Sequence, residues 1–213
     1  MKKLLSLAAA TLALVGVGQT LAASSVDLSI KGSITPAACT PMLANGGVVD
    51  HGKISAKDLV FNGNTVLPEA LLPLSISCEA PTLVAVKSKD NRAGTSAEWE
   101  GALPNFGLGL AAGNVKIGWY TLKMINATVD NAPGRLIESV NGQAWFEAPD
   151  NTVWQPDWMR TVNGASSVDP VPQPLMVMRT DVVIATTITR ARDLPLSEEI
   201  LIDGSATLDI VYL

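Results

Sequence analysis

The sequence predicts an all-β fold, arranged as either a sandwich or a barrel. Turn signals rich in glycine and asparagine recur along the chain, for example at Asn62-Gly63-Asn64 and at Asn141-Gly142. Short apolar or alternating runs lie between these turns, and helix signals are weak. Short strands punctuated by frequent turns are typical of sandwiches and barrels.

Residues 1–22 have the features of a secretory signal peptide. Lys2 and Lys3 precede an apolar stretch from Leu4 to Val17, which is too short to span a bilayer comfortably. A retained membrane anchor is the alternative, and that length disfavours it. We expect cleavage after Ala22, so that residues 23–213 form one exported domain.

Directly after the signal peptide, the sequence predicts a strand with one apolar face. Val26, Leu28, Ile30 and Ile34 alternate with polar residues, and Gly32 falls on the same parity. By alternation alone this is an ordinary first strand with a polar outer face. Its place at the mature N-terminus suggests the alternative of a strand offered to another chain.

Two further runs predict strands in the middle of the chain. Leu72–Cys78 alternates cleanly, with Cys78 on the apolar parity. The run 115–124 begins with its apolar residues on odd positions and ends with them on even positions. A strand cannot change faces without an extra residue, so we expect a β-bulge or a sheet switch near Tyr120 and Thr121.

The C-terminal region predicts a hairpin. The runs 199–202 and 205–208 flank Asp203-Gly204, a strong signal for a two-residue turn. The last run, 206–213, alternates almost to its end.

The segment from about 144 to 174 differs from the rest of the chain. It contains several prolines and the aromatic residues Trp145, Phe146, Trp154 and Trp158, and it predicts an irregular insertion. We favour the interpretation that these aromatic side chains pack over one edge of the core. The alternative is a platform for a sugar or a partner, formed by Trp145, Trp154 and Trp158.

Composition excludes some classes of partner. The chain has a formal net charge of −5, and its basic residues form no clusters. This argues against binding nucleic acid and against anionic membrane surfaces. Beyond the signal peptide, no stretch is long and apolar enough to cross a membrane, so we expect no stable membrane insertion. Hydrophobic residues make up 47% of the chain and charged residues only 16%, so either the core is large or some apolar surface is meant for a partner.

The two cysteines, Cys39 and Cys78, predict one disulfide, because a lone pair in an exported chain usually bonds. Two free thiols are the alternative. A metal site is disfavoured, because the chain has a single histidine, His51, and no Cys-x-x-Cys spacing. We predict no cofactor.

The sequence predicts no enzyme. A Ser-His-Asp triad could use only His51, and no G-x-S-x-G nucleophile elbow is present. Glycine-rich phosphate loops, calcium loops and H-E-x-x-H are also missing from the sequence. An exported hydrolase that uses His51 is a distant third hypothesis, and we interpret His51 as a surface or strand-edge residue.

Three features together resemble the subunits of chaperone–usher pili. The first is the alternating run Val26–Ile34 with its glycine, a few residues before Cys39. The second is the cysteine pair, with Val49-Asp50-His51-Gly52-Lys53-Ile54 between the cysteines and Leu74-x-Ile76-x-Cys78 at the end. The third is a C-terminal strand with a penultimate tyrosine, Tyr212. The middle of the chain, at Phe106–Leu110 and Lys116–Tyr120, resembles the GltF-like pilin-related family, whose members are periplasmic.

The resemblance implies an immunoglobulin-like, pilin-type antiparallel β-sandwich that lacks one strand. It implies that residues 24–37 form a donor strand that completes a neighbouring subunit. Val26, Leu28, Ile30 and Ile34 would then be the apolar plugs, and Gly32 would lie where the groove is too crowded for a side chain. In the same way, Leu208, Ile210 and Tyr212 would be recognised by a chaperone.

The first functional hypothesis is therefore an exported, non-enzymatic structural subunit of a fimbria, assembled by donor-strand complementation. Its partners would be a periplasmic pilus chaperone, an outer-membrane usher and neighbouring pilin subunits. Its location would be the periplasm and the cell-surface fimbrium of a Gram-negative bacterium. The second hypothesis is a soluble periplasmic binding or accessory protein with a pilin-like fold.

Overall fold

The computed structural model describes residues 28–31, 38–98, 104–164 and 168–213. The chain divides into two compact units, Met1–Ile34 and Thr35–Leu213. The second unit contains all the strands of the structure, and the predicted signal peptide lies outside the described residues.

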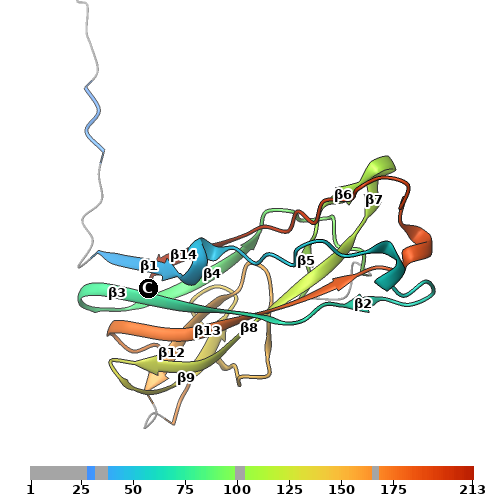
Figure 1. Cartoon of the computed structure of the whole chain (residues 1–213). Coiled ribbons are helices and arrows are strands. Elements are labelled where there is room, and N and C mark those ends of the chain that lie inside the picture. The colour runs from blue at the N-terminus through green and yellow to red at the C-terminus, as the bar shows by residue number, and fades with distance from the viewer. Residues whose placement is uncertain (1–27, 32–37, 99–103, 165–167) are drawn as a thin grey trace, which may run out of the picture. The chain divides into compact units, whose positions relative to one another are not determined.

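The second unit is built from β-strands joined by turns and short 3-10 helices (Figure 1). The 3-10 helices are η1 (Ala44–Gly47), η2 (Ala56–Asp58), η3 (Ala112–Asn114) and η4 (Ala191–Asp193), and the described residues contain no α-helix. The strands are β1 (Cys39–Leu43), β2 (Thr65–Val66), β3 (Ala70–Thr82), β4 (Val84–Asp90), β5 (Phe106–Gly107), β6 (Leu110–Ala111), β7 (Val115–Lys116), β8 (Gly118–Val129), β9 (Ala132–Ser139), β10 (Phe146–Glu147), β11 (Val153–Trp154), β12 (Met159–Gly164), β13 (Leu175–Ile188) and β14 (Ala206–Tyr212).

One continuous path of paired strands organises this unit. Its order is β1-β3-β13-β8-β9-β12-β4-β14, within a sheet of 12 strands that curves into a nearly closed, barrel-like arrangement. All of its ladders are antiparallel, which confirms the predicted all-β antiparallel class. β13 is the longest strand at 14 residues, and it pairs with β3 on one side and β8 on the other.

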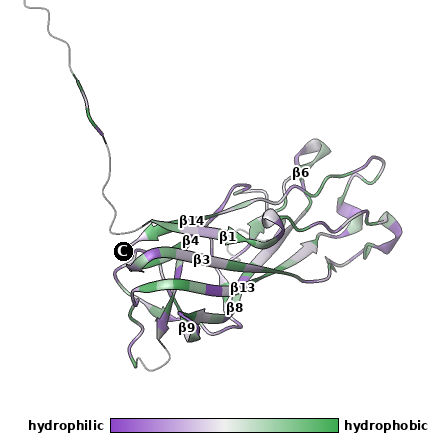
Figure 2. Ribbon diagram, turned by 60° about the vertical axis from the view of Figure 1, so that its left-hand side comes forward, coloured by the Kyte–Doolittle hydropathy of each residue, from purple (hydrophilic) through white to green (hydrophobic). Residues whose placement is uncertain are grey.

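The core follows from alternation along these strands. In β3, Leu72, Leu74, Ile76 and Cys78 are buried, while most of the residues between them are exposed. This confirms the strand predicted from the run Leu72–Cys78. Figure 2 shows apolar and polar residues mixed along each long strand, as expected when only one face of a strand meets the core. Burial of each large apolar side chain contributes roughly 1.5–3 kcal/mol.

The predicted bulge near Tyr120 and Thr121 was wrong in position. Both residues pair regularly with β13, through Thr186 and Ala185. The change of face occurs earlier, where β7 ends and β8 begins, because Ile117 and Gly118 are both buried. A bulge does lie in β8, where the β13 register shifts between Arg179 and Asp181 and Asn126 has a φ of 55°.

The predicted hairpin at Asp203-Gly204 was also wrong. β14 pairs with β4, and residues 199–205 form neither strand nor helix. The Asp203 backbone N–H donates to the Leu108 carbonyl oxygen at 3.0 Å, and the Asp203 carboxylate accepts from the Arg92 guanidinium at 2.9 Å. These contacts with distant parts of the chain hold the segment in place of a local turn.

The segment 144–174 is less irregular than predicted. It contributes β10, β11 and β12, and β12 lies between β9 and β4. Trp154 is fully buried, and its indole N–H donates to the carbonyl oxygen of Trp158 at 3.0 Å. Trp145 and Trp158 are half-buried. Trp154 therefore presents no exposed face in this structure.

The predicted disulfide joins Cys39 of β1 to Cys78 of β3. The two residues are register partners in neighbouring antiparallel strands. The bond therefore fixes the edge strand β1 to the rest of the sheet, and a disulfide is typical of an oxidising, exported environment.

β12 and β9 bury a charged pair. Arg160 is fully buried, and its Nη2 and Nε atoms donate to Glu138 Oε2 at 2.8 and 3.1 Å. Nη2 also donates to the Thr152 carbonyl oxygen at 3.2 Å, and the guanidinium carbon lies 5.7 Å from the centroid of the Trp154 ring. Burial lowers the pKa of Arg160, and the hydrogen bond with Glu138 opposes that shift.

Removal of the disulfide should destabilise the domain. The cysteines are 39 residues apart, so the double variant Cys39→Ser/Cys78→Ser should lose roughly 3–4 kcal/mol of unfolding free energy, because the unfolded chain is no longer constrained. Urea denaturation measures this loss, and the unreduced wild-type protein should give linked peptides by mass spectrometry. An unchanged urea midpoint would contradict the stabilising role.

Glu138→Gln should destabilise the domain by about 3–5 kcal/mol, because it leaves the Arg160 charge buried without its partner. Glu147→Gln is the matched control: it removes an exposed pair with Arg135, at 2.9 Å, and should cost at most about 1 kcal/mol. The double variant Glu138→Leu/Arg160→Met should recover most of the loss. Equal urea midpoints for Glu138→Gln and Glu147→Gln would contradict this account.

Candidate functional site

The strand path has two ends, and these ends lie beside each other. β1 pairs with β3, β14 pairs with β4, and no ladder in the described part of the chain joins β1 to β14. Figures 1 and 2 both show β14 next to β1. One contact bridges the gap: the Cys39 backbone N–H donates to the Tyr212 hydroxyl oxygen at 3.0 Å.

A hollow of about 250 Å³ lies between these two edges. Leu43 and Val49 line one side of it, and Ala206 and Leu208 line the other. Its floor comes from the sheet beneath and includes Leu122 and Ile184.

A second hollow of about 480 Å³ continues from the first. It lies between the segments 49–59 and 194–202, and its apolar lining includes Ile54 and Ile200. Val49, His51 and Ile202 line both hollows, so the two form one groove. We call the two hollows together the open groove.

Apolar side chains along the open groove are only partly covered. They pack against the core but remain half-buried, as for Leu43, Val49, Ile54, Ile200, Ala206 and Leu208. In the first hollow this surface lies between the edge strands β1 and β14, where an extended peptide could add as a strand and insert alternate side chains.

The predicted residues of the last strand share the inner face of β14. Leu208, Ile210 and Tyr212 are register partners of Ser88, Val86 and Val84, all of which are buried. Leu208 and Ile210 are half-buried, whereas Tyr212 is 39% exposed; of the three, only Leu208 lines the groove.

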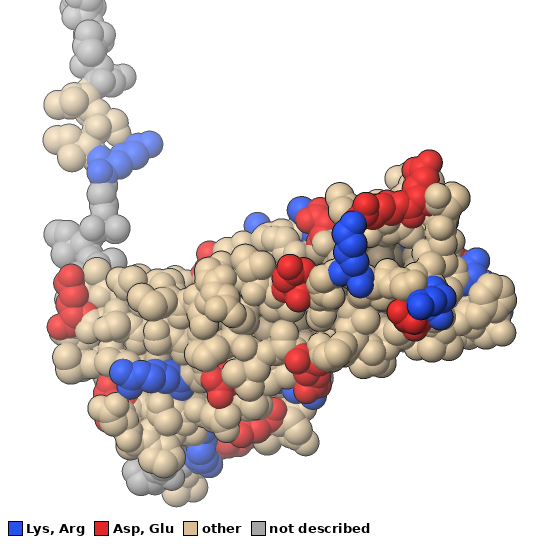
Figure 3. Space-filling model, viewed as in Figure 1, with Lys and Arg blue, Asp and Glu red and all other residues tan. Residues whose placement is uncertain are grey.

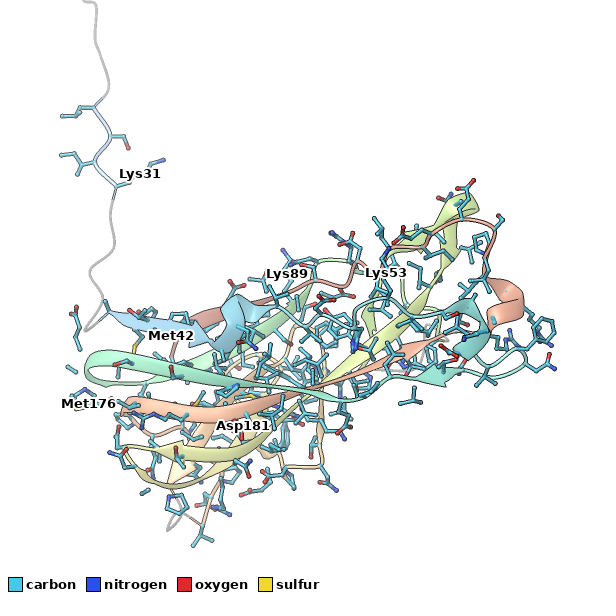
Figure 4. The ribbon with its side chains drawn as sticks, in the orientation of Figure 1. Lys31, Met42, Lys53, Lys89, Met176 and Asp181 are labelled. Atoms are coloured by element: carbon cyan, nitrogen blue, oxygen red, sulfur yellow. A yellow bond between two sulfur atoms is a disulfide. The ribbon has the colours of Figure 1, made fainter. Side chains whose placement is uncertain are left out.

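Polar side chains also line the groove. His51 Nε2 lies 3.0 Å from the Thr186 hydroxyl oxygen, and Thr186 is itself buried. Burial raises the pKa of the Tyr120 hydroxyl well above its usual range. Lys53, labelled in Figure 4, pairs with Glu199 at 3.9 Å on the rim of the second hollow. On the face drawn in Figure 3, acidic and basic side chains are scattered over a mostly uncharged surface.

The predicted donor strand, residues 24–37, is described only at Leu28–Lys31. Val26, Gly32 and Ile34 lie outside the described residues. Leu28 and Ile30 are 86% and 89% exposed, and neither belongs to a strand or a helix. Trp145, Trp154 and Trp158 line neither hollow.

Sequence reasoning missed most of the groove. The segment 194–202 forms one of its walls, and only its alternating Ile200 and Ile202 could have suggested this. His51 was interpreted as a surface or strand-edge residue, but it is half-buried at the centre of the groove.

Neither a metal cluster nor a membrane-spanning helix is found in residues 28–31, 38–98, 104–164 and 168–213. Within these ranges, no group of three or more His, Cys, Asp or Glu residues is placed to hold a metal ion. No helix in the same ranges is long and apolar enough to cross a bilayer.

Comparisons with known proteins identify relatives over the full length. A family model described as "Protein of unknown function (DUF1120)" matches residues 28–103. Protein GltF of Escherichia coli strain K12 is 30% identical over an alignment of 258 positions, which covers 100% of this chain and 99% of GltF. Uncharacterized protein YhcF of the same strain is 26% identical, covering 90% of this chain and 92% of YhcF.

Asp203→Asn should increase the local opening of residues 195–205, which form one wall of the groove. The hydrogen bond from Arg92 lowers the pKa of Asp203, so this contact is present at neutral pH and is lost as the pH falls through that lowered value. Hydrogen exchange of residues 195–205 at neutral pH should therefore be faster in the variant. Glu199→Gln is the control: it removes only the exposed pair with Lys53 and should leave hydrogen exchange unchanged. Equal exchange rates in the wild type, Asp203→Asn and Glu199→Gln would contradict the role of Asp203.

Proposed function

The chain belongs to the GltF family, and from its open groove we propose that it is an exported, pilin-like structural subunit completed by donor-strand complementation. In this proposal the domain is an immunoglobulin-like sandwich that lacks one strand. The signal-peptide features and the disulfide support export.

One observation carries the proposal: β1 and β14 are both edges, and half-buried apolar side chains line the gap between them. An added strand would hydrogen-bond to both edges and would cover the apolar lining at the same time. It would also remove the aggregation hazard of two open edges.

The N-terminal segment of a neighbouring subunit is the proposed occupant. Its residues Val26, Leu28, Ile30 and Ile34 alternate as a groove-filling strand requires, with Gly32 at a position where a side chain would be crowded. Leu28 and Ile30, the two described plugs, are 86% and 89% exposed. Each inserted plug would contribute roughly 1.5–3 kcal/mol.

The remaining partners follow from the same proposal. Before assembly, a periplasmic chaperone would protect the groove and would contact Leu208, Ile210 and Tyr212 on β14. An outer-membrane usher would then exchange the chaperone for the next subunit. The protein would be located in the periplasm and in a cell-surface fimbrium of a Gram-negative bacterium.

A second candidate function is that of a soluble periplasmic binding or accessory protein with a pilin-like fold. The second hollow favours it, because about 480 Å³ is within the usual range for small-molecule sites.

Peptide binding tests the first function. The recipient is the mature full chain carrying Ile30→Asp, so that its own segment cannot act as a donor. A peptide of residues 24–37 at hundredfold excess over its Kd should raise the free energy of unfolding by about 2–3 kcal/mol. The Ser29→Asp peptide, changed on the outward parity, should bind similarly, whereas the Ile30→Asp peptide should not bind.

Two outcomes would contradict the proposal. Equal stabilisation by the Ile30→Asp and Ser29→Asp peptides would show that alternation does not matter. No stabilisation by any peptide would favour a self-contained periplasmic protein.

A further inference from the structure

The single histidine of the chain lies where the two hollows of the open groove meet. His51 lines both hollows, together with Val49 and Ile202. Its Nε2 atom is 3.0 Å from the hydroxyl oxygen of Thr186 on β13, and Thr186 is only 3% exposed. The imidazole is therefore tethered to the floor of the groove, in a lining that is otherwise mainly apolar.

The charged groups around His51 are on the rim and in water. Asp50, Lys53, Glu198 and Glu199 line the second hollow, and all four are exposed. Asp50 Oδ1 accepts the Gly52 backbone N–H at 2.7 Å, and Lys53 pairs with Glu199 at 3.9 Å. Solvent screens such exposed charges, so their attraction or repulsion for the imidazole is weak.

The first hollow adds only one titratable side chain, Tyr120. Its pKa is raised by burial, so its hydroxyl stays neutral at any pH near neutrality. An imidazole is the side chain that ordinarily changes charge between about pH 5 and 8. His51 is the only imidazole of the chain, and it lines both hollows.

We propose that His51 makes occupancy of the open groove pH-dependent, so that the groove accepts an apolar strand at neutral pH and releases it in mild acid. This inference rests on the proposed function. A strand in the groove would remove water from the imidazole, and loss of water disfavours the charged form. Binding in acid must therefore displace a proton, and affinity falls as the pH drops.

Loss of water from the ring sets the sign of this effect, and the contact with Thr186 leaves the neutral ring with a hydrogen-bond partner. The neutral ring keeps its hydrogen bond to the Thr186 hydroxyl when the groove is filled, because that contact lies within the floor. The protonated ring would carry a second N–H donor and a positive charge into an apolar interface, where neither has a partner among the apolar plugs.

The test measures the affinity of one peptide as a function of pH. The probe is an acetylated, fluorescently labelled peptide of residues 24–37, and the recipient is the full chain with Ile30→Asp. Fluorescence anisotropy at constant ionic strength should give a Kd about tenfold weaker near pH 5 than near pH 8. His51→Gln keeps a side chain that can hydrogen-bond to Thr186, and it should reduce this difference to less than about twofold.

Asp50→Asn is the matched control, because it removes a neighbouring rim charge and leaves the imidazole in place. The Kd of this variant should change with pH as it does for the recipient with Asp50. Thermal unfolding at each pH verifies that all recipients remain folded. Two results would overturn the inference while leaving the proposed function intact. One is a Kd that does not change with pH in the recipient that contains His51, and the other is an equal change of Kd with pH after His51→Gln. No binding at any pH would overturn the proposed function, and the inference with it.

Discussion

Backbone groups along two strand edges are the constraint around which this domain is organised. Every buried N–H and C=O group needs a partner, and an exposed edge offers a row of such groups to any extended chain. In the described residues, the strand path begins at β1 and ends at β14 without a ladder between them. The apolar side chains of the groove are likewise incomplete in their contacts, because they pack against the core on one side only and remain half-buried.

The rest of the fold holds these two edges at a fixed distance from each other. β13 joins β3 to β8, and the disulfide fixes β1 to β3 at the start of the path. On the other side, β12 anchors β4 to β9, and the Arg160–Glu138 pair lies inside this part of the sheet. The Tyr212 hydroxyl spans the gap at one end only, which leaves the remainder of the groove open.

Local patterns predicted the local features of this fold, and long-range contacts determined the others. The alternation of Leu72–Cys78 was enough to predict the central part of β3. The presence of two cysteines in an exported chain was enough to predict the disulfide. The hairpin at Asp203-Gly204 failed because Arg92, far away in sequence, holds Asp203 in another arrangement. A buried arginine such as Arg160 carries no local signal, because arginine is ordinarily exposed. The groove could not be predicted because its walls come from opposite ends of the chain.

The position of the only histidine has a practical consequence. A protein with one imidazole gives one Cε1–H and one Cδ2–H resonance from histidine, so no mutagenesis is needed to decide which histidine a resonance comes from. Since this ring lies at the junction of the two hollows, its chemical shift reports on the centre of the groove in the unlabelled, unmodified chain. A screen of histidine-free peptides could therefore distinguish molecules that enter the groove from those that adhere elsewhere on the surface.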